Sequence, residues 1–246
     1  MSRYFLEVAY KGTNYSGFQI QQNANSIQAE LEKAFQTLQK EKIDLTGSSR
    51  TDAGVHALQN YFHFDFTGEI NPHFVYKMNA ILPGDIVVQK IIQVRLDAHC
   101  RFDAISREYK YFVFGHKDPF LRDRAFYFPY KLDIGLLREG AGIIKEYTDF
   151  TSFSKRNTQA KTFICNILEC KWEREEDCLV FNVKADRFLR GMVRAFVATL
   201  LKMGRQKMSI DEFKKVIEGK DSSKASFGAP AHGLFLVCVN YPSDYF

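Results

Sequence analysis

Apolar positions in the first part of the chain recur with two periods, one typical of strands and one typical of helices. Residues 3–10 alternate and predict a strand. Residues 27–38 have a helical period and predict a helix that begins with a capping box of Asn25 and Gln28. Its apolar stripe consists of Ile27, Leu31, Ala34, Phe35 and Leu38.

The rest of this half predicts two further strands, a helix that ends at Pro83-Gly84, and a last strand. Their expected ranges are residues 43–46, 57–66, 72–82 and 86–94. One face of the long strand is expected to carry Leu58, Phe62, Phe64 and Phe66. The predicted order of elements is therefore βαββαβ.

The same order recurs in the second half. Strands are predicted at residues 105–114, 162–172, 179–184 and 234–241, helices at 134–147 and 188–203, and an additional helix at 210–217. The order βαββαβ is that of the ferredoxin-like unit. Two copies predict an α+β fold with a merged antiparallel sheet and a cleft between the halves. We expect the halves to span residues 1–100 and 101–246.

Composition narrows the class of protein. A chain of 246 residues with 46% hydrophobic content can bury a core without disulfides. Its five cysteines include no CxxC pair, which favours reduced thiols and a reducing compartment. No segment approaches the roughly 18 apolar residues of a membrane span, so we expect a cytoplasmic protein with no membrane partner. A net charge of +5 is compatible with a polyanionic partner but does not establish one.

The segment GSSRTDAGVHA, residues 47–57, concentrates polar chemistry in a predicted loop. Arg50 and Asp52 are two residues apart, so an ion pair would keep the carboxylate charged, but from spacing alone a simple turn clasp is favoured. His56 with Asp52 is a conceivable metal pair. A catalytic zinc site needs three protein ligands, however, and the other histidines are scattered singly. We expect His56 to be structural.

Two other segments can complete a site. Arg107, Tyr109 and Tyr111 share one face of a predicted strand, which suits a stacked base and its phosphate, although an amphipathic sheet face is the alternative. Arg187, Arg190 and Arg194 recur at helical spacing. Arg194 is predicted to lie more than one turn inside its helix, where a buried partner such as Asp52 is attractive.

Several motifs together resemble the tRNA pseudouridine synthases of the TruA family, nearly end to end. They are YKGTNYSGFQIQQN, SSRTDAGVHA, LPGDIVV, DAHCRFDAISREYKY, FLRGMVRAFVATLLKMG and APAHGLFLVCVNYP. The chain departs from the common pattern at Phe18, Cys100 and Ala198, where Trp, Ala and Gly are frequent. None of these exchanges removes a catalytic group.

The resemblance implies a pseudouridine synthase fold in which Asp52 is the nucleophile, Arg50 neighbours it and Arg194 pairs with it. It also implies that Tyr109 contacts the target base and that Leu234 lines the uridine pocket. Members are typically homodimers that act on uridines 38, 39 and 40 in the anticodon stem-loop of tRNA, without cofactor or metal.

The implied chemistry is consistent with these residues. Isomerisation breaks the bond from C1′ to N1 and rejoins C1′ to C5, with no net redox change, so a carboxylate can serve without a cofactor. The base must leave the stem at a cost of a few kcal/mol, which stacking on Tyr109 helps offset. Arg107, Arg187, Arg190 and residues 155–156 are expected to contact RNA. The alternatives are a non-catalytic RNA-binding protein and a metal-dependent hydrolase built on Asp52 and His56.

Overall fold

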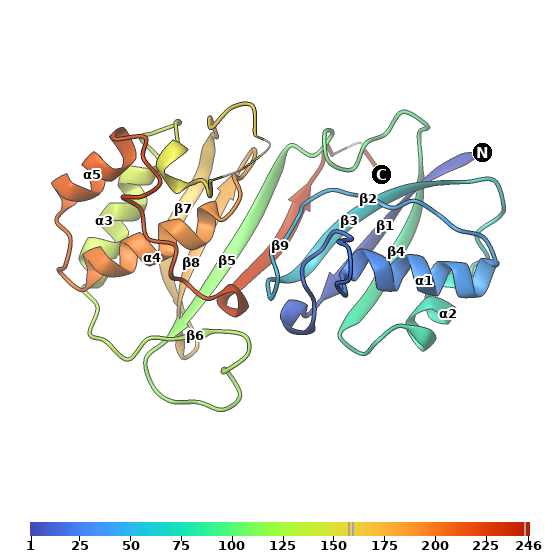
Figure 1. Ribbon diagram of the computed structural model, residues 1–246, viewed down its shortest axis with the longest axis horizontal. Helices are drawn as coiled ribbons and strands as arrows, with labels where there is room; N and C mark the ends of the chain where they lie inside the picture. The colour runs from blue at the N-terminus through green and yellow to red at the C-terminus, as the bar shows by residue number, and fades with distance from the viewer. Residues whose placement is uncertain (157, 159, 244) are drawn as a thin grey trace. The chain divides into compact units, whose positions relative to one another are not determined.

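The chain forms two compact units in a computed structural model that describes residues 1–156, 158, 160–243 and 245–246. One unit contains residues 1–105 and 235–246, and the other contains residues 106–234 (Figure 1). Each unit combines strands with helices, which confirms the predicted α+β class. Among the described residues, no helix has the length and apolar character that a membrane span requires.

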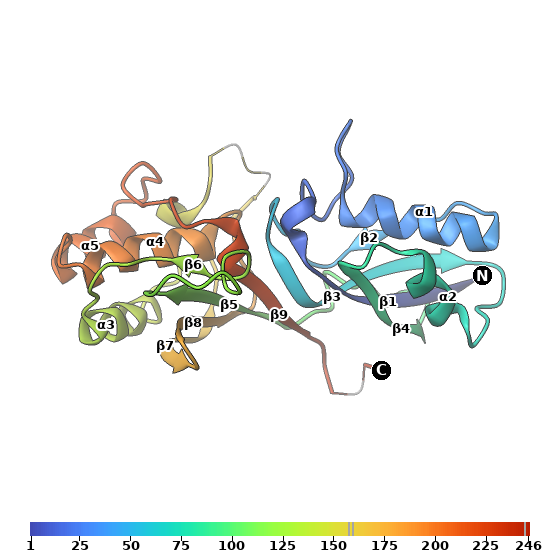
Figure 2. The ribbon, with the colours of Figure 1, turned by 90° about the horizontal axis from the view of Figure 1, so that it is seen from below.

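The first unit has the predicted succession of elements. They are β1 (Ser2–Tyr10), α1 (Ile27–Gln39), β2 (Thr46–Gly47), β3 (His56–Phe66), α2 (Phe74–Ile81) and β4 (Ile86–Val94). Strand β1 lies between β4 and β3 and is antiparallel to both, and the short β2 pairs with β3. Figure 2 shows α1 along one face of these strands. Phe35 of α1 packs edge-on against Phe64 and Phe74, with ring centroids 5.3 Å and 5.1 Å away.

Two local predictions in this unit are wrong. The cap of α1 is Ser26, whose side chain accepts a hydrogen bond from the amide of Ala29, because Ser26 has the extended backbone that an N-cap requires. Leu58 is 52% exposed. The register of β1 against β3 shifts between Val8 and Tyr10, so β3 has an extra residue there, and this breaks the strict alternation of its faces.

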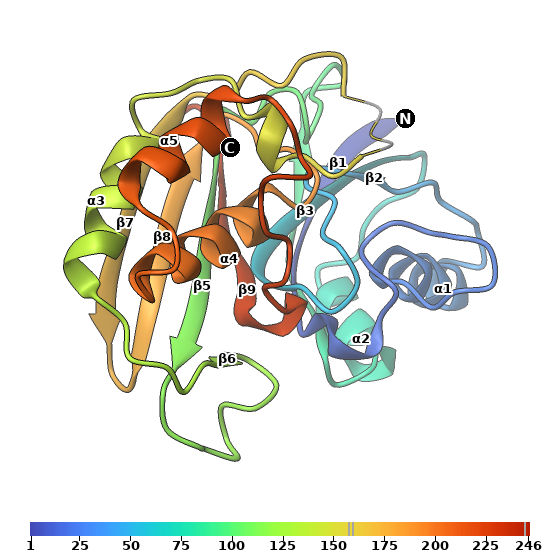
Figure 3. The ribbon, with the colours of Figure 1, turned by 60° about the vertical axis from the view of Figure 1, so that its left-hand side comes forward.

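The second unit contains most of the elements of the other half. They are β5 (Ser106–Phe114), β6 (Phe126–Tyr127), α3 (Ile134–Ile144), β7 (Ile167–Glu175), β8 (Cys178–Ala185), α4 (Met192–Gly204) and α5 (Ile210–Glu218). Strand β8 lies between β5 and β7 and is antiparallel to both. In Figure 3, α4 crosses in front of β8 and β5. The strand predicted from residue 162 begins only at Ile167, and before it Ile164 forms an isolated bridge with Asp149.

The last strand, β9 (Leu234–Asn240), differs from the predicted antiparallel arrangement. It pairs in parallel with β3, with Phe235 opposite His56 and Leu236 opposite Ala57. Beyond it, the ring of Tyr241 packs 5.6 Å from that of Phe5. The C-terminal residues are therefore grouped with residues 1–105, and this division differs from a single boundary at residue 100.

The beginning of α4 also differs from the prediction. Gly191, with a φ of +75°, is the N-cap, and the helix begins at Met192 instead of residue 188. Arg187 and Arg190 therefore precede the helix. Arg194 is in its first turn, so the prediction that it lies more than a turn inside is wrong.

Candidate active site

The loop that joins β2 to β3 carries Asp52 and is held to the sheet by hydrogen bonds on both sides. The amide of Ser48 donates to the carbonyl of Tyr61 at 2.8 Å, and the hydroxyls of Thr51 and Tyr10 are 2.8 Å apart. The side-chain amide of Asn60 is fully buried and donates to the carbonyl of Ser49 at 2.8 Å. Because most of these partners are buried, the loop presents its side chains from a rigid support.

Asp52 is the one carboxylate in the loop between β2 and β3, residues 48–55. Its carbonyl accepts from the amide of Val55 at 3.2 Å in a turn that contains Gly54, whose φ of +78° favours glycine. The Asp52 side chain is half-buried, between the buried Thr51 and the exposed Ala53. Arg50, two residues before it, is exposed. The pairing of Arg50 with Asp52 therefore stays a prediction.

His56 has a structural environment. It is 2% exposed, and its Nδ1 accepts from the amide of Gly12 at 3.1 Å. Its ring lies 4.6 Å from that of Phe235. These contacts connect β3 to the short helix η1 (Gly12–Asn14) and to β9. They hold the ring in place between three elements, which supports the structural role expected for His56.

In the second unit, the tyrosines of β5 are buried. Tyr109 is 8% exposed and packs edge-to-face on Phe188, with centroids 5.0 Å apart. Tyr111 is fully buried, burial raises its pKa, and its hydroxyl donates to the carbonyl of Pro230 at 2.8 Å. Both rings are therefore largely covered, and contact between Tyr109 and a base stays a prediction. The contact with Phe188, which the sequence did not suggest, restricts the orientation of the Tyr109 ring.

Three arginines that are expected to contact RNA, Arg107, Arg187 and Arg190, lie near the end of β8 and the beginning of α4. Arg107 donates from Nη1 to the carbonyl of Asp186 at 3.0 Å, and the Asp186 carboxylate accepts the amide of Arg187 at 2.6 Å. The carbonyl of Arg190 accepts the amide of Lys155 at 2.9 Å. The main chains at Lys155 and Arg190, from two distant stretches of sequence, are thus adjacent.

Arg194 and Leu234 are each well positioned by their surroundings. The Nε of Arg194 donates to the carbonyl of Ala229 at 2.7 Å, which restricts the direction of its guanidinium. Leu234 is 6% exposed and follows the short helix η3 (Ala231–Gly233). Gly233 of η3 lies against Tyr111, where an added Cβ would be 2.7 Å from the ring. Only glycine allows this close approach.

Comparison with known proteins identifies the family. A family model described as tRNA pseudouridine synthase matches residues 7–103 and 147–242. The tRNA pseudouridine synthase A of Parabacteroides distasonis is 46% identical over 248 residues, covering all of this chain and 98% of that protein. Its counterpart from Bacteroides thetaiotaomicron is 48% identical over 250 residues, covering all of this chain and 93% of that protein. The chain therefore belongs to the tRNA pseudouridine synthase family, as its motifs predict.

The match to the family model includes the loop with Asp52 and the segment from Arg187 to Arg194, while Arg107 and Tyr109 lie outside the matched ranges. Among solved structures, the CRISPR endoribonuclease Cse3 bound to a 19-nucleotide RNA aligns with a TM-score of 0.23 and 10% identity. That alignment covers 83% of this chain and 97% of the other. It supports no conclusion about this protein.

Proposed function

We propose that this protein isomerises uridine to pseudouridine at positions 38, 39 and 40 of the tRNA anticodon stem-loop, with Asp52 as the nucleophile. The observation that carries the proposal is the half-buried Asp52 on a loop pinned by Ser48 and Thr51, within a stretch that matches the family model. A carboxylate held by a rigid support is suited to attack an electrophilic carbon.

The reaction balances without an oxidant or a co-substrate. The glycosidic bond from C1′ to N1 breaks, C1′ bonds to C5, C5 loses its proton and N1 gains one. Asp52 can form a covalent bond at C6 of the base or at C1′ of the ribose, or it can abstract a proton and initiate elimination, and each route needs the ionised carboxylate. The resemblance to the family assigns Arg194 as the charge partner of Asp52 and Arg50 as its neighbour in the site.

The remaining roles concern the bound nucleotide. Tyr109 contacts the flipped base, and its edge-to-face packing on Phe188 supports this role because it restricts the ring. Leu234, nearly buried, provides an apolar wall of the uridine pocket that limits access of water to the intermediate. Arg107, Arg187 and Arg190 contact RNA, together with the basic pair at residues 155–156. Hydrogen bonds around Asp186 and between Lys155 and Arg190 support their grouping.

Release of tritium from C5-labelled uridine in tRNA tests the proposal. Asp52→Ala and Asp52→Asn should lower the rate by at least about three orders of magnitude, because no other group replaces a lost nucleophile. Asp44→Asn, at an exposed position of the same unit, is the matched control and should keep the native rate. Both Asp52 variants should have the same midpoint temperature of thermal unfolding as the native protein and should still bind tRNA.

Equal tritium release by the native protein and Asp52→Asn would overturn the role of Asp52. Tight tRNA binding with no pseudouridine formed by the native protein would instead identify a non-catalytic RNA-binding protein. Mapping pseudouridine by carbodiimide treatment and primer extension assigns the modified positions. Full activity of the native protein in EDTA would exclude a metal-dependent reaction.

We also propose that the protein is a homodimer and works in the cytoplasm, where its tRNA substrate is found. The family resemblance supports the dimer. Light scattering during size-exclusion chromatography should give twice the 28.5 kDa of one chain, and a mass of one chain at micromolar concentration would contradict it.

A further inference from the structure

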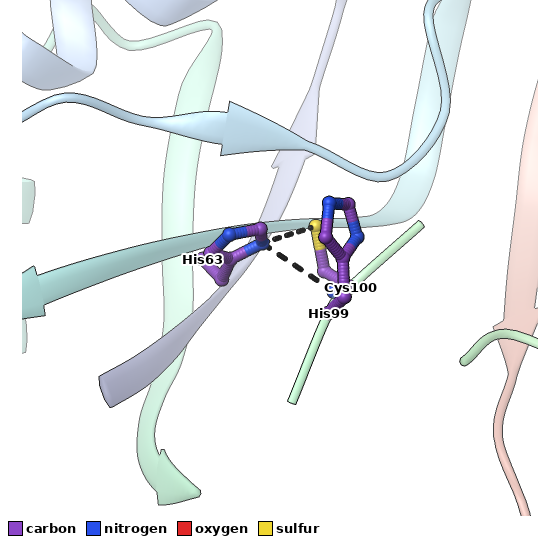
Figure 4. Close-up of side chains that lie close together, drawn as sticks. All are labelled: His63, His99 and Cys100. Carbon is purple, nitrogen blue, oxygen red and sulfur yellow. Dashed lines mark hydrogen bonds between the residues drawn. The ribbon is translucent and has the colours of Figure 1, made fainter. Parts of the chain in front are cut away.

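Three side chains with metal-binding atoms lie together in the first unit. None of them belongs to the loop that carries Asp52. They are His63 of β3 and the adjacent His99 and Cys100, which follow β4 (Figure 4). One ligand atom from each lies within 4.8 Å of the others, and this is the single such trio found among the described residues. The sequence did not suggest it, because His63 is 37 positions from Cys100.

The trio already makes close contacts. Figure 4 shows His63 facing Cys100, with Nδ1 of His63 3.2 Å from the sulfur and 3.4 Å from the Cys100 amide. The rings of His63 and His99 meet edge-to-face with centroids 4.6 Å apart. Zinc bonds of about 2.3 Å to sulfur and 2.0–2.1 Å to nitrogen, at a tetrahedral angle, place sulfur and nitrogen about 3.5 Å apart. The distance from Nδ1 of His63 to the sulfur of Cys100 would have to increase slightly, and the ring of His99 would have to move closer to both atoms.

The trio is largely shielded from solvent. Cys100 is fully buried, His63 is 7% exposed and His99 is half-buried.

The hydrogen bonds of Cys100 and His99 indicate which of their atoms donate and which accept. The Cys100 thiol donates to the carbonyl of Thr46 at 3.1 Å. Nδ1 of His99 accepts the amides of Arg101 and Phe102 at 3.1 Å and 3.4 Å, so its neutral ring has its proton on Nε2. A metal bound to Nε2 would transfer the ring proton to Nδ1 and release these two amides. Both residues are exposed, so water can accept the released amides.

We propose that Cys100, His63 and His99 form a structural site for a zinc ion, which attaches the segment after β4 to β3. One thiolate and two imidazoles suit Zn²⁺ and copper, and they are poor ligands for Mg²⁺ or Ca²⁺. Binding displaces the thiol proton of Cys100 to solvent, and water can occupy the fourth position. The isomerisation makes no use of this ion.

Titration of the chelator-treated protein with Co²⁺ tests the site, because a thiolate bound to Co²⁺ gives a near-ultraviolet charge-transfer band. One equivalent of Co²⁺ per chain should produce the band, and Zn²⁺ should remove it by displacing the cobalt. Cys100→Ala should abolish the band and should fold, since alanine is a small apolar residue that suits this fully buried position. Cys238→Ala, at a half-buried thiol outside the trio, is the matched control and should keep the band.

Two further measurements distinguish a three-ligand site from a lone thiol. His99→Asn, which retains an acceptor for the amides of Arg101 and Phe102, should weaken Co²⁺ binding at least tenfold. In the native protein, Zn²⁺ should shift the amide resonances of Arg101 and Phe102. A missing band, a band that persists in Cys100→Ala, or unchanged affinity in His99→Asn would overturn the proposal. Isomerase activity is not the readout, so this outcome is separate from that of the proposed function.

Discussion

At the scale of single residues, Gly12 supports the loop that carries Asp52. Its amide donates to His56, and an added Cβ would lie 2.0 Å from the carbonyl oxygen of Val55. No side chain can be accommodated at this distance unless the main chain moves. The geometry of the loop thus depends on a glycine in a different element.

Gly12→Ala should therefore lower the free energy of unfolding by about 1–3 kcal/mol, the usual effect of overpacking a filled site. It should also lower isomerase activity, because the displaced Val55 belongs to the turn of Asp52. Urea unfolding and tritium release measure the two effects. Gly142→Ala in α3 is the control: an added Cβ meets no atom within 4 Å, and we expect stabilisation by about 0.5–1 kcal/mol. Equal stability of both variants would contradict this account.

The candidate residues differ in how far sequence alone could assign them. Asp52 belongs to a dense polar motif, so its chemistry is local and visible in the sequence. The partner of Tyr109 is Phe188, from a distant segment, and no local pattern specifies that contact. The spacing suggested that Arg50 pairs with Asp52. The direction of the exposed Arg50 side chain depends on how the turn folds, which the spacing does not specify.

At the scale of elements, α5 shows the clearest local specification. Ser209 accepts the amide of Glu212 at 3.2 Å, and the Glu212 carboxylate accepts the amide of Ser209 at 2.7 Å. This capping box satisfies two amides at a helix end that has no intrahelical acceptors for them.

Ser209→Ala should destabilise the protein by about 1 kcal/mol, because one amide of the first turn loses its acceptor. Lys214→Ala, on the same helix and outside the cap, should change stability by no more than about 0.5 kcal/mol. Chemical unfolding of both variants is the measurement. A Ser209→Ala variant as stable as Lys214→Ala would show that the cap contributes nothing.

At the scale of the whole molecule, the net charge of +5 is relevant to RNA binding only if the cationic residues cluster. Arg156 and Arg190 are exposed, and the contact between Lys155 and Arg190 brings their two segments together. Such clustering favours phosphate binding, because each neutralised phosphate releases counterions.

Arg156→Gln and Arg190→Gln should each weaken tRNA binding and lower the slope of log Kd against log salt by about 0.7–0.9, the contribution of one phosphate contact. Filter binding over a range of salt concentrations measures the slope. Lys171→Gln is the matched control, since Lys171 is already 2.9 Å from the Glu173 carboxylate on β7. A slope that is unchanged in the two arginine variants would remove these residues from the proposed RNA-binding surface.

The sequence by itself determined the α+β class, most of the order of elements and the loop with Asp52, because hydrophobic periods and polar motifs are local properties of the chain. Tertiary structure alone decided the parallel pairing of β9 with β3, the exposure of Leu58 beside an irregular register, and the meeting of His63 with Cys100. Each of these depends on contacts between segments far apart in sequence. Such contacts are set by packing and strand register, which a local pattern does not encode.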